Sequence, residues 1–304
     1  MNKKNTTITI GIPAFNEEQN IGKLIKALLA QDYANVKLEN ILIVSDGSTD
    51  KTVEELKKIK NEKISVIDRK KRKGAMNTQN EILSLANSDI LIMLDADVLP
   101  YGRNFVRELI KPILDDRKVG LVGAAIDSIP GRGFFERVIS DSHDFKKSVY
   151  EKFNQGDNVY MCHGRARAFK KGFYKNLTWA EEGPEDAFSY LYCKKRGFKF
   201  KFAPKAIVQF RSPARFDDHA KQSMRFEQGK RNIEKYFNKK VVEIEYKIPF
   251  KYIAADLARF LLKSPLKAIS FLFIKLYILY LSERKQVDLS TWDIATSSKK
   301  LSWK

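Results

Sequence analysis

Two carboxylates, Asp95 and Asp97, come directly after the apolar run at residues 90–94. Side chains two residues apart in an extended chain point the same way, so both carboxylates can bind one hard cation such as Mg²⁺ or Mn²⁺. A cation held in this way can neutralise phosphate groups. The same Asp-x-Asp pattern also occurs where an aspartate only caps a turn, so the motif alone leaves both interpretations open.

The apolar run predicts a buried strand of a parallel sheet, because it is continuous and is followed by the turn residues Pro100 and Gly102. In open α/β sheets, ligands bind beyond the carboxyl ends of the strands. We therefore expect Asp95 and Asp97 to point into a crevice at that edge of the sheet.

Strand and helix patterns alternate along the chain. The expected strands are residues 8–12 (ending at Pro13), 41–44, 64–67, 90–94, 119–124, 199–202 and 206–210. The expected helices are one opened by a capping box at Asn16 and Gln19, followed by 52–60, 75–86, 105–114, 134–153, 187–196 and 217–237. The alternation predicts a parallel sheet covered on both faces. Neither GxGxxG nor GxxxxGK[ST] occurs, which argues against a dinucleotide-binding Rossmann domain and a P-loop NTPase.

Composition adds a strong positive charge. The chain has 304 residues with 56 Lys and Arg against 37 Asp and Glu, a net charge of +19. This charge predicts attraction to an anion, which can be nucleic acid, an acidic membrane surface or a phosphorylated substrate. Cys162 and Cys193 lack the spacing of a metal site and are expected to be buried thiols in a reducing compartment.

Several further motifs occur in a fixed order around the two aspartates. They are Ile12-Pro13-Ala14-Phe15-Asn16-Glu17-Glu18, Val44-Ser45-Asp46-Gly47-Ser48-Thr49-Asp50, Lys73-Gly74, Asp95-Ala96-Asp97, Glu185-Asp186 and Gln222-Ser223-Met224-Arg225-Phe226. In this order, over residues 7–237, the chain resembles the inverting family 2 glycosyltransferases of the GT-A fold. The resemblance implies an α/β fold with a mixed, mainly parallel sheet sandwiched by helices. It also implies transfer of a sugar from a nucleotide diphosphate donor.

The expected donor site lies near the strand ends. Phe15 offers a face on which a pyrimidine can stack, and Glu17 and Asp46 can accept hydrogen bonds from a ribose or a base, or else take part in helix capping. By resemblance, Asp46 binds the nucleoside, Asp95 lies near the ribose, and Asp97 holds Mn²⁺ or Mg²⁺ against the diphosphate, with Asp95 as a second metal candidate. The full set expected to bind the nucleotide sugar is Pro13, Ala14, Phe15, Glu17, Asp46, Lys73, Gly74 and Asp95.

By resemblance, Asp186 is the expected general base, with Glu185 beside it. A helix N-terminus lowers the pKa of a carboxyl group, whereas a neighbouring Glu185 and desolvation raise it, so the sequence leaves the direction open. Without its context, such an acidic pair would be interpreted as an N-terminal turn that favours the helix dipole.

Gln222, Arg225 and Phe226 share one face of the expected helix. They resemble the Gln-x-x-Arg-Trp signature of cellulose-synthase-like and hyaluronan-synthase-like members, with Phe226 in place of Trp. This difference argues against processive polymer synthesis, while Arg225 remains a candidate for the diphosphate. His163 is expected to line the acceptor pocket, and His219 is either an additional metal ligand or a structural histidine.

The chain changes character after residue 240. We expect a catalytic domain at 1–240 and an apolar helical extension at 241–304, with helices at 252–263 and 266–281 interrupted at Pro265. A polar stripe on these helices contains Asp256, Arg259, Lys263, Lys267 and Ser270. Residues 250–282 are expected to lie in a membrane interface with lysines toward anionic headgroups. The alternatives are a tilted span and a helical hairpin packed on the catalytic domain or on a second subunit.

The sequence therefore predicts a metal-dependent inverting glycosyltransferase, a hexosyltransferase, at the cytoplasmic face of a membrane. Its expected acceptor is a glycan or a polyprenyl-phosphate-linked molecule. One alternative, a sugar nucleotidyltransferase, normally has a Gly-rich basic signature after its first strand, and Pro13-Ala14-Phe15 is not one. A non-catalytic membrane scaffold and a basic nucleic-acid-binding protein are further alternatives, although no nucleic-acid partner is expected.

Overall fold

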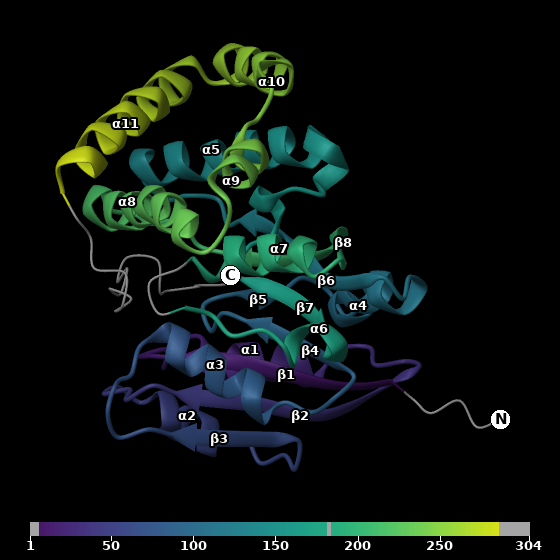
Figure 1. Ribbon diagram of the computed structural model, residues 1–304. Coiled ribbons are helices and arrows are strands. Elements are labelled where there is room, and N and C mark those ends of the chain that lie inside the picture. The colour runs from purple at the N-terminus through teal and green to yellow at the C-terminus, as the bar shows by residue number, and fades with distance from the viewer. Residues whose placement is uncertain (1–5, 181–183, 286–304) are drawn as a thin grey trace.

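The computed structural model describes residues 6–180 and 184–285. One eight-stranded sheet runs through it in the order β3-β2-β1-β4-β7-β6-β8-β5 (Figure 1). Its strands are β1 (Thr6–Ala14), β2 (Val36–Ser45), β3 (Ile64–Asp68), β4 (Ile90–Leu94), β5 (Leu99–Pro100), β6 (Val119–Ser128), β7 (Ala166–Lys170) and β8 (Lys199–Phe210). β7 runs antiparallel to β4 and β6, and β5 runs antiparallel to β8, while the other pairs are parallel. The predicted mixed, mainly parallel sheet is confirmed.

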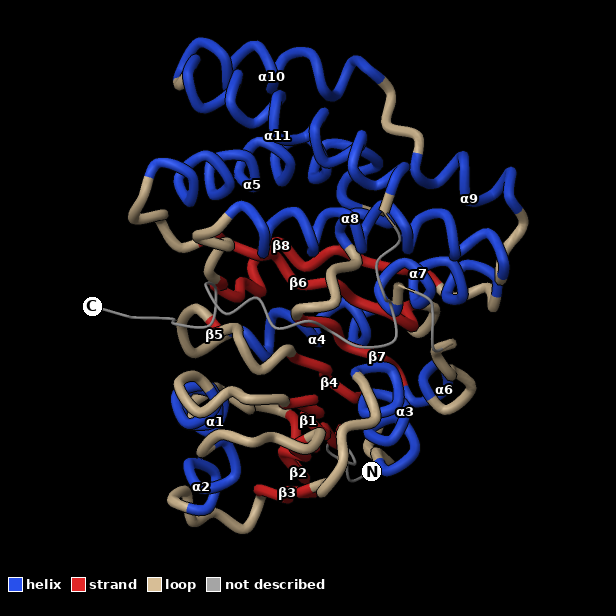
Figure 2. The backbone as a smooth tube through the Cα atoms, turned by 90° about the vertical axis from the view of Figure 1, so that its left-hand side faces the viewer, coloured by secondary structure: helices blue, strands red, loops and turns tan. Residues whose placement is uncertain are grey.

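Helices cover both faces of this sheet (Figure 2). The helices are α1 (Ile21–Leu29), α2 (Thr52–Lys57), α3 (Ala75–Leu85), α4 (Phe105–Asp115), α5 (Phe134–Lys152), α6 (Lys171–Tyr174), α7 (Glu185–Lys195), α8 (Phe216–Asn232), α9 (Lys239–Tyr246), α10 (Phe250–Lys263) and α11 (Pro265–Arg284). Residues of α1, α2 and α4 join one core cluster against the sheet, and residues of α3, α6 and α7 join the other. All five residues of β4 are buried, as expected for a central strand between two helical layers.

Several predicted boundaries were wrong. The first helix begins at Ile21, and Asn16 does not cap it, since Asn16 has a positive φ of 54° and its Oδ1 accepts a hydrogen bond from the backbone N–H of Thr49 at 2.7 Å. The two strands expected at 199–202 and 206–210 are one strand, β8, with an irregularity in its pairing to β6. The first strand continues to Ala14, and β7 and α9 were not predicted.

The helices α5, α8, α10 and α11 form a separate layer beyond β8 (Figures 1 and 2). Ion pairs attach the last two helices to α5: Lys152 Nζ lies 2.6 Å from Asp256 Oδ2, and Lys267 Nζ lies 2.5 Å from Asp141 Oδ2. The predicted orientation of the polar stripe was therefore wrong in part, because Asp256 and Lys267 face α5 rather than lipid headgroups.

The opposite side of α10 and α11 is apolar and exposed. We call it the outward apolar face, and it consists of Leu262, Leu266, Ile269, Phe273, Leu276, Tyr277 and Tyr280. Within the described chain, α11 is the one helix long and apolar enough to cross a membrane, and 22% of its apolar window is buried. The pair of helices thus packs on the rest of the chain, as one of the alternatives had it, and leaves an apolar surface outside.

Candidate active site

Most of the predicted donor-site residues meet at one edge of the sheet. β1, β2 and β4 are parallel neighbours, so their carboxyl ends lie together and bring Ala14, Asp46 and Asp95 to the same edge. The backbone N–H of Asp46 donates to the carbonyl oxygen of Ala14 at 2.8 Å, which ties the ends of β1 and β2.

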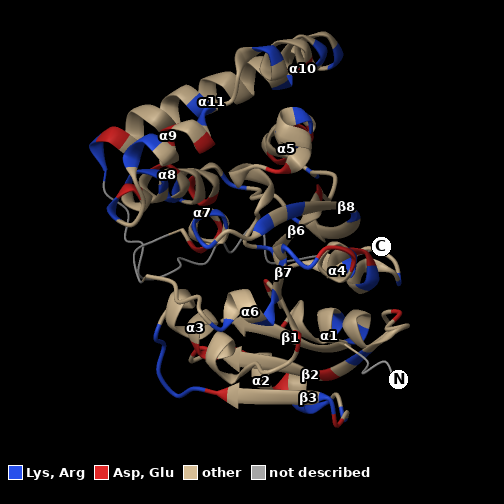
Figure 3. Cartoon of the chain, turned by 45° about the vertical axis from the view of Figure 1, so that its right-hand side comes forward, with Lys and Arg blue, Asp and Glu red and all other residues tan. Residues whose placement is uncertain are grey.

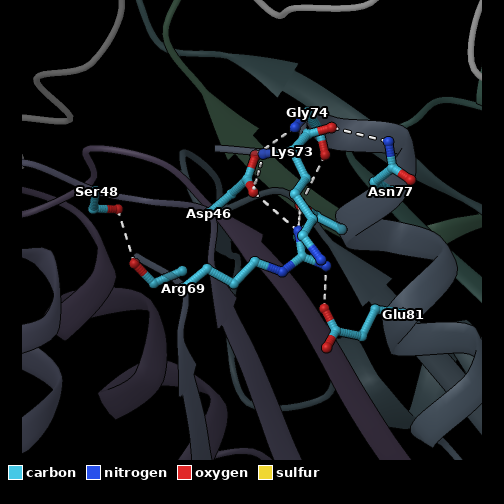
Figure 4. Close-up of polar contacts among 9 residues, drawn as sticks. Asp46, Ser48, Arg69, Lys73, Gly74, Asn77 and Glu81 are labelled. Atoms are coloured by element: carbon cyan, nitrogen blue, oxygen red, sulfur yellow. Dashed lines mark hydrogen bonds and ion pairs between the residues drawn. The ribbon is translucent and has the colours of Figure 1, made fainter. Parts of the chain in front are cut away.

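Asp46 organises the basic loop at residues 69–74 (Figure 4). Its carboxylate accepts hydrogen bonds from the backbone N–H groups of Lys73 and Gly74, each at 2.8 Å, and from the guanidinium of Arg69 at 2.9 Å. Asp46 is buried, so these charge-assisted bonds are expected to be strong. The side chain predicted to bind the nucleoside thus also holds the loop that carries Lys73 and Gly74.

Gly47 makes room for the same loop. It has a φ of +70°, and a Cβ atom built on it would lie 2.7 Å from the backbone nitrogen of Arg72. Arg72 in turn lies with its guanidinium carbon 3.9 Å from the ring centroid of Phe15. Phe15, predicted to stack on a base, therefore already has a cation over its ring. Glu17 lies just before α1, and its carboxylate accepts a hydrogen bond from Asn20 Nδ2 at 3.0 Å.

Asp95 and Asp97 follow β4 as predicted, and both are partly buried. Within the described ranges, neither carboxylate makes a hydrogen bond or an ion pair. Burial, and then the charge of Asp97, raise the pKa of Asp95, against the lowering effect of Arg165 and Arg167. Two such carboxylates repel each other, and a bound cation would relieve that repulsion.

A divalent cation fits this pair. Among residues 6–180 and 184–285, no three His, Cys, Asp or Glu side chains gather as a metal site. Mg²⁺ is usually bound by one or two carboxylates together with substrate phosphates, so Asp95 and Asp97 would need a phosphorylated ligand to complete the coordination. The donor set is made of hard oxygens, which suits Mg²⁺ or Mn²⁺.

Sequence reasoning missed Arg165 and Arg167. The backbone N–H of Asp95 donates to the carbonyl oxygen of Arg165 at 3.0 Å, and the β4–β7 register places Arg167 opposite Met93. Arg167 is fully buried, and its Nη1 donates at 3.1 Å both to the carbonyl oxygen of Glu185 and to the hydroxyl of Ser189. The signal that was overlooked is the alternation Arg165-Ala166-Arg167-Ala168, which is typical of a strand.

Through Arg167, the start of α7 is held against β7. Arg167 Nη2 also lies 3.8 Å from Glu185 Oε1. Gly164 permits the approach of this glutamate, because a Cβ atom there would lie 2.4 Å from Glu185 Oε1. The predicted pair Glu185 and Asp186 thus lies beside β7, whose first residues adjoin the end of β4.

Burial decides the pKa direction that the sequence left open. Desolvation raises the pKa of Asp186, while Arg167 and the backbone N–H of Ala187 act to lower it. Desolvation and then the charge of Asp186 raise the pKa of Glu185. Asp186 also contributes to the raised pKa of Asp95, so the two predicted functional sites lie within electrostatic reach of each other.

The face of α8 that carries Gln222, Arg225 and Phe226 turns toward α7. Gly229 lies on the same face, and a Cβ atom built on it would lie 3.3 Å from Pro184 Cβ, next to Glu185. Gln222 and Arg225 are half-buried, whereas Phe226 is exposed and lies edge-on to Tyr246 at 6.5 Å between ring centroids. Their roles stay predictions.

The histidines are held in the neutral form. Burial, followed by Arg165 and Lys146, lowers the pKa of His163 to about 3. Burial also lowers the pKa of His219 to about 4. His219 packs edge-on to Phe135 at 6.1 Å between ring centroids, and Ser223 Oγ lies 3.5 Å from its Nε2. These contacts favour the structural interpretation of His219, and metal binding by it stays a prediction.

Known proteins resemble this chain. The dolichyl N-acetyl-alpha-D-glucosaminyl phosphate 3-beta-D-2,3-diacetamido-2,3-dideoxy-beta-D-glucuronosyltransferase of Methanococcus voltae is 28% identical over 178 residues, 56% of this chain and 50% of that protein. The chain spans half or less of the length of the first curated relatives it matches.

Two solved structures share the fold. The mannosyltransferase PcManGT of Pyrobaculum calidifontis, in complex with GDP-Man and Mn²⁺, superposes with a TM-score of 0.62 at 18% identity, covering 95% of this chain and 78% of that one. Glucosyl-3-phosphoglycerate synthase of Mycobacterium tuberculosis, in complex with Mn²⁺, UDP and phosphoglyceric acid, gives a TM-score of 0.52 at 17% identity, covering 73% and 76%. The expected GT-A fold is confirmed.

A family model gives the relationship directly. The model described as Glycosyl transferase family 2 matches residues 9–178, which is more than half of the chain. The match includes the loop at residues 69–74, Asp95 and Asp97, and β7. The protein therefore belongs to glycosyl transferase family 2.

Proposed function

We propose that this protein is a metal-dependent inverting glycosyltransferase that moves a hexose from a nucleotide diphosphate donor to a glycan or a polyprenyl-phosphate-linked acceptor. The observation that carries the proposal is the pair Asp95 and Asp97. Both carboxylates lie at the sheet edge where β1, β2 and β4 end and make no hydrogen bond or ion pair with the described residues. A metal with a donor diphosphate would satisfy both of them.

The geometry supports a division of roles among these residues. Phe15, Asp46 and the loop at residues 69–74 would hold the nucleoside, and Arg225 is a candidate for the diphosphate. The cation would stabilise the negative charge that develops on the leaving nucleoside diphosphate. Asp186 would take the proton of an acceptor hydroxyl on the other side of the sugar, and its raised pKa makes the ionised carboxylate a stronger base.

The proposed location is the cytoplasmic face of a membrane. The outward apolar face of α10 and α11 supports membrane contact, because soluble monomers rarely expose a large contiguous apolar patch. The relative in Methanococcus voltae is named for a dolichyl N-acetyl-alpha-D-glucosaminyl phosphate, which is a lipid-linked sugar. In Figure 3 most of α11 carries no charge, while the basic loop lies far from it, between β3 and α3.

The test is thermal stabilisation of the detergent-purified chain by UDP, GDP, CDP and TDP, each with and without Mn²⁺. A ligand that binds the folded state at 100 times its Kd stabilises by about 2.7 kcal/mol. We expect one nucleotide to give a shift that depends on Mn²⁺. Failure of all four to stabilise folded protein would contradict the proposal and would favour a scaffold or a nucleic-acid-binding protein.

A further inference from the structure

A buried arginine lies among apolar side chains beside the candidate general base. Arg167 of β7 is fully buried and shares a face of the strand with Phe169. Its guanidinium carbon lies 5.4 Å from the ring centroid of Phe169 and 5.6 Å from that of Trp179, and both rings belong to one apolar core cluster. Well-packed apolar side chains often replace a buried ion pair without loss of stability. Stability alone therefore does not account for an arginine at this position.

The hydrogen bonds of Arg167 are directed to the first turn of α7. Its Nη1 donates to the carbonyl oxygen of Glu185, which belongs to the peptide group that joins Glu185 to Asp186. Ser189 Oγ accepts from the same nitrogen at 3.1 Å and donates to that carbonyl oxygen at 2.5 Å. Because a peptide group is planar, fixing its oxygen also fixes the backbone nitrogen of Asp186. The Asp186 carboxylate accepts from the N–H of Ala187 at 2.6 Å, so the same turn holds it.

One turn of α3 connects this contact to the candidate donor site. Thr78 Oγ1 accepts a hydrogen bond from Arg69 Nη1 at 2.9 Å, and the same nitrogen donates to Asp46 Oδ1 at 2.9 Å. The next residue, Gln79, is buried, and its Oε1 accepts from Arg167 Nη2 at 3.5 Å. Adjacent residues of α3 thus contact the cation that holds Asp46 and the cation that holds α7.

Asn80 continues the same turn and connects it to α7 by a second route. Its side-chain amide exchanges two hydrogen bonds of 2.9 Å with the backbone N–H and carbonyl groups of Trp179. The indole Nε1 of Trp179 donates to Ser189 Oγ at 2.9 Å. The buried serine hydroxyl therefore accepts from both Arg167 and Trp179 while it donates within α7. One helix, α3, thereby supports both the donor site and the first turn of α7.

We propose that Arg167 is a positioning residue, which holds Asp186 at a fixed place relative to the donor site through the first turn of α7. Because Arg167 is fully buried, it acts through Asp186 and does not touch the substrate. Misplacing a reacting group by about 1 Å can lower a rate about 100-fold. This inference rests on the proposed function, which takes Asp186 as the base, and it adds how that base is kept in place.

The experiment is a double-mutant cycle on nucleotide-sugar hydrolysis by the full chain in detergent. Arg167→Met and Ser189→Ala are each made alone and together with Asp186→Asn, and kcat is measured for every variant. Alone, Arg167→Met should lower kcat about 10- to 100-fold, and Ser189→Ala should lower it less. In the Asp186→Asn background both should have little further effect, since the group that they position is gone.

Donor binding separates loss of positioning from general loss of structure. The Mn²⁺-dependent shift in Tm with the stabilising nucleoside diphosphate should be kept in both variants, because the contacts of Asp46 with the basic loop remain. Ser189→Ala also leaves in place the charge of Arg167, which acts to lower the pKa of Asp186. Its effect on kcat therefore reports geometry rather than charge.

Ser142→Ala on α5 is the matched control for Ser189→Ala. Ser142 is likewise fully buried, and its hydroxyl donates to a carbonyl oxygen of its own helix, that of Ile139, at 2.7 Å. Its kcat should equal that of the wild type even where its Tm falls. Wild-type kcat in both Arg167→Met and Ser189→Ala would overturn the inference, as would an equal loss with and without Asp186.

The two proposals fail in different ways. If no nucleoside diphosphate stabilises the wild type with Mn²⁺, or if Asp186→Asn hydrolyses the nucleotide sugar at the wild-type rate, the proposed mechanism is wrong. If a nucleotide binds and Asp186→Asn is slow, but the effects of the second substitution are independent of it, only the role of Arg167 is wrong. Ser189→Ala removes one hydroxyl group and keeps the buried charge, so it completes the cycle even if Arg167→Met does not fold.

Discussion

Asp95 and Arg165 are bound to each other across the β4–β7 pair, with the N–H of Asp95 donating to the carbonyl oxygen of Arg165 at 3.0 Å. The hydrogen bond joins the residue that follows β4 to the residue that precedes β7, which runs antiparallel to β4. It brings a predicted metal-binding carboxylate next to Arg165, whose charge acts to lower the pKa of that carboxylate. The end of β4 and the start of β7 are thus connected in the candidate active site by backbone as well as by charge.

The substitution Asp97→Asn is expected to remove the metal-dependent part of nucleotide binding, because it halves the negative charge offered to the cation. The Mn²⁺-dependent shift in Tm should disappear, and release of nucleoside diphosphate from the stabilising nucleotide sugar should fall about 100-fold or more. Asp115→Asn on α4 is the control, since Asp115 is exposed and forms an ion pair with Lys111. An Asp97→Asn variant with full activity would show that the metal role is wrong.

The pH dependence of activity should report Asp186. A general base must be ionised, and burial raises the pKa of Asp186, so activity should be lost, as the pH falls, above the ordinary aspartate pKa of about 4. The pH profile is measured as kcat/KM for hydrolysis of the nucleotide sugar, a reaction in which water is the acceptor. In Asp186→Asn the rate should be about 10²- to 10⁴-fold lower and this acid limb absent. An unchanged acid limb in the variant would contradict the assignment.

Gly47→Ala is expected to disturb the basic loop. The new Cβ atom would lie 2.7 Å from the backbone nitrogen of Arg72, so the loop must move. Gly102→Ala is a matched control, because Gly102 has a similar φ of +73° but nothing within 4 Å of its Cβ position. Both variants should lose about 1–2 kcal/mol through backbone strain, and Gly47→Ala alone should also lose nucleotide affinity. Equal nucleotide affinity in the two variants would show that the basic loop does not take part in binding the donor.

The outward apolar face should bind membranes. In a flotation assay with vesicles that contain anionic lipid, we expect the wild type to rise with the vesicles and most of the double variant Phe273→Ser, Leu276→Ser to stay at the bottom of the gradient. The variant loses about 25 cal/mol of binding free energy per Å² of apolar contact removed. Ile244→Ser is the control, since Ile244 is 69% exposed but lies on α9. A wild type that stays with the soluble fraction would contradict membrane contact through this face.

The sequence predicted the strands at the candidate donor site well, because parallel strands carry strong signals. β4 is a continuous apolar run, and the polar motifs with Asp46 and Asp95 follow strands whose carboxyl ends must meet. Local pattern and global fold agree in this half of the chain. The contacts that satisfy Asp46 could not be predicted, since they come from the basic loop more than twenty residues away.

The acceptor side was harder to predict because its charges are buried. A segment with Arg165 just before the strand and Arg167 inside it is polar in sequence, and Arg167 is stabilised inside by acceptors distant in sequence: Gln79, Glu185 and Ser189. Lys275 was seen as the edge of an amphipathic stripe, and its neighbour Lys146 comes from α5. Only the packing of α11 on α5 brings these charges together.

The ion pairs of Asp256 and Lys267 also have a consequence for how the protein behaves in solution. They turn charged side chains inward and leave the outward apolar face toward the solvent. In plain buffer, two molecules can bury this surface by packing their outward apolar faces together. The net charge of +19 on each molecule opposes this contact by electrostatic repulsion. Added sulfate would screen that repulsion and strengthen apolar association together. The protein should therefore salt out early, and detergent should redissolve it.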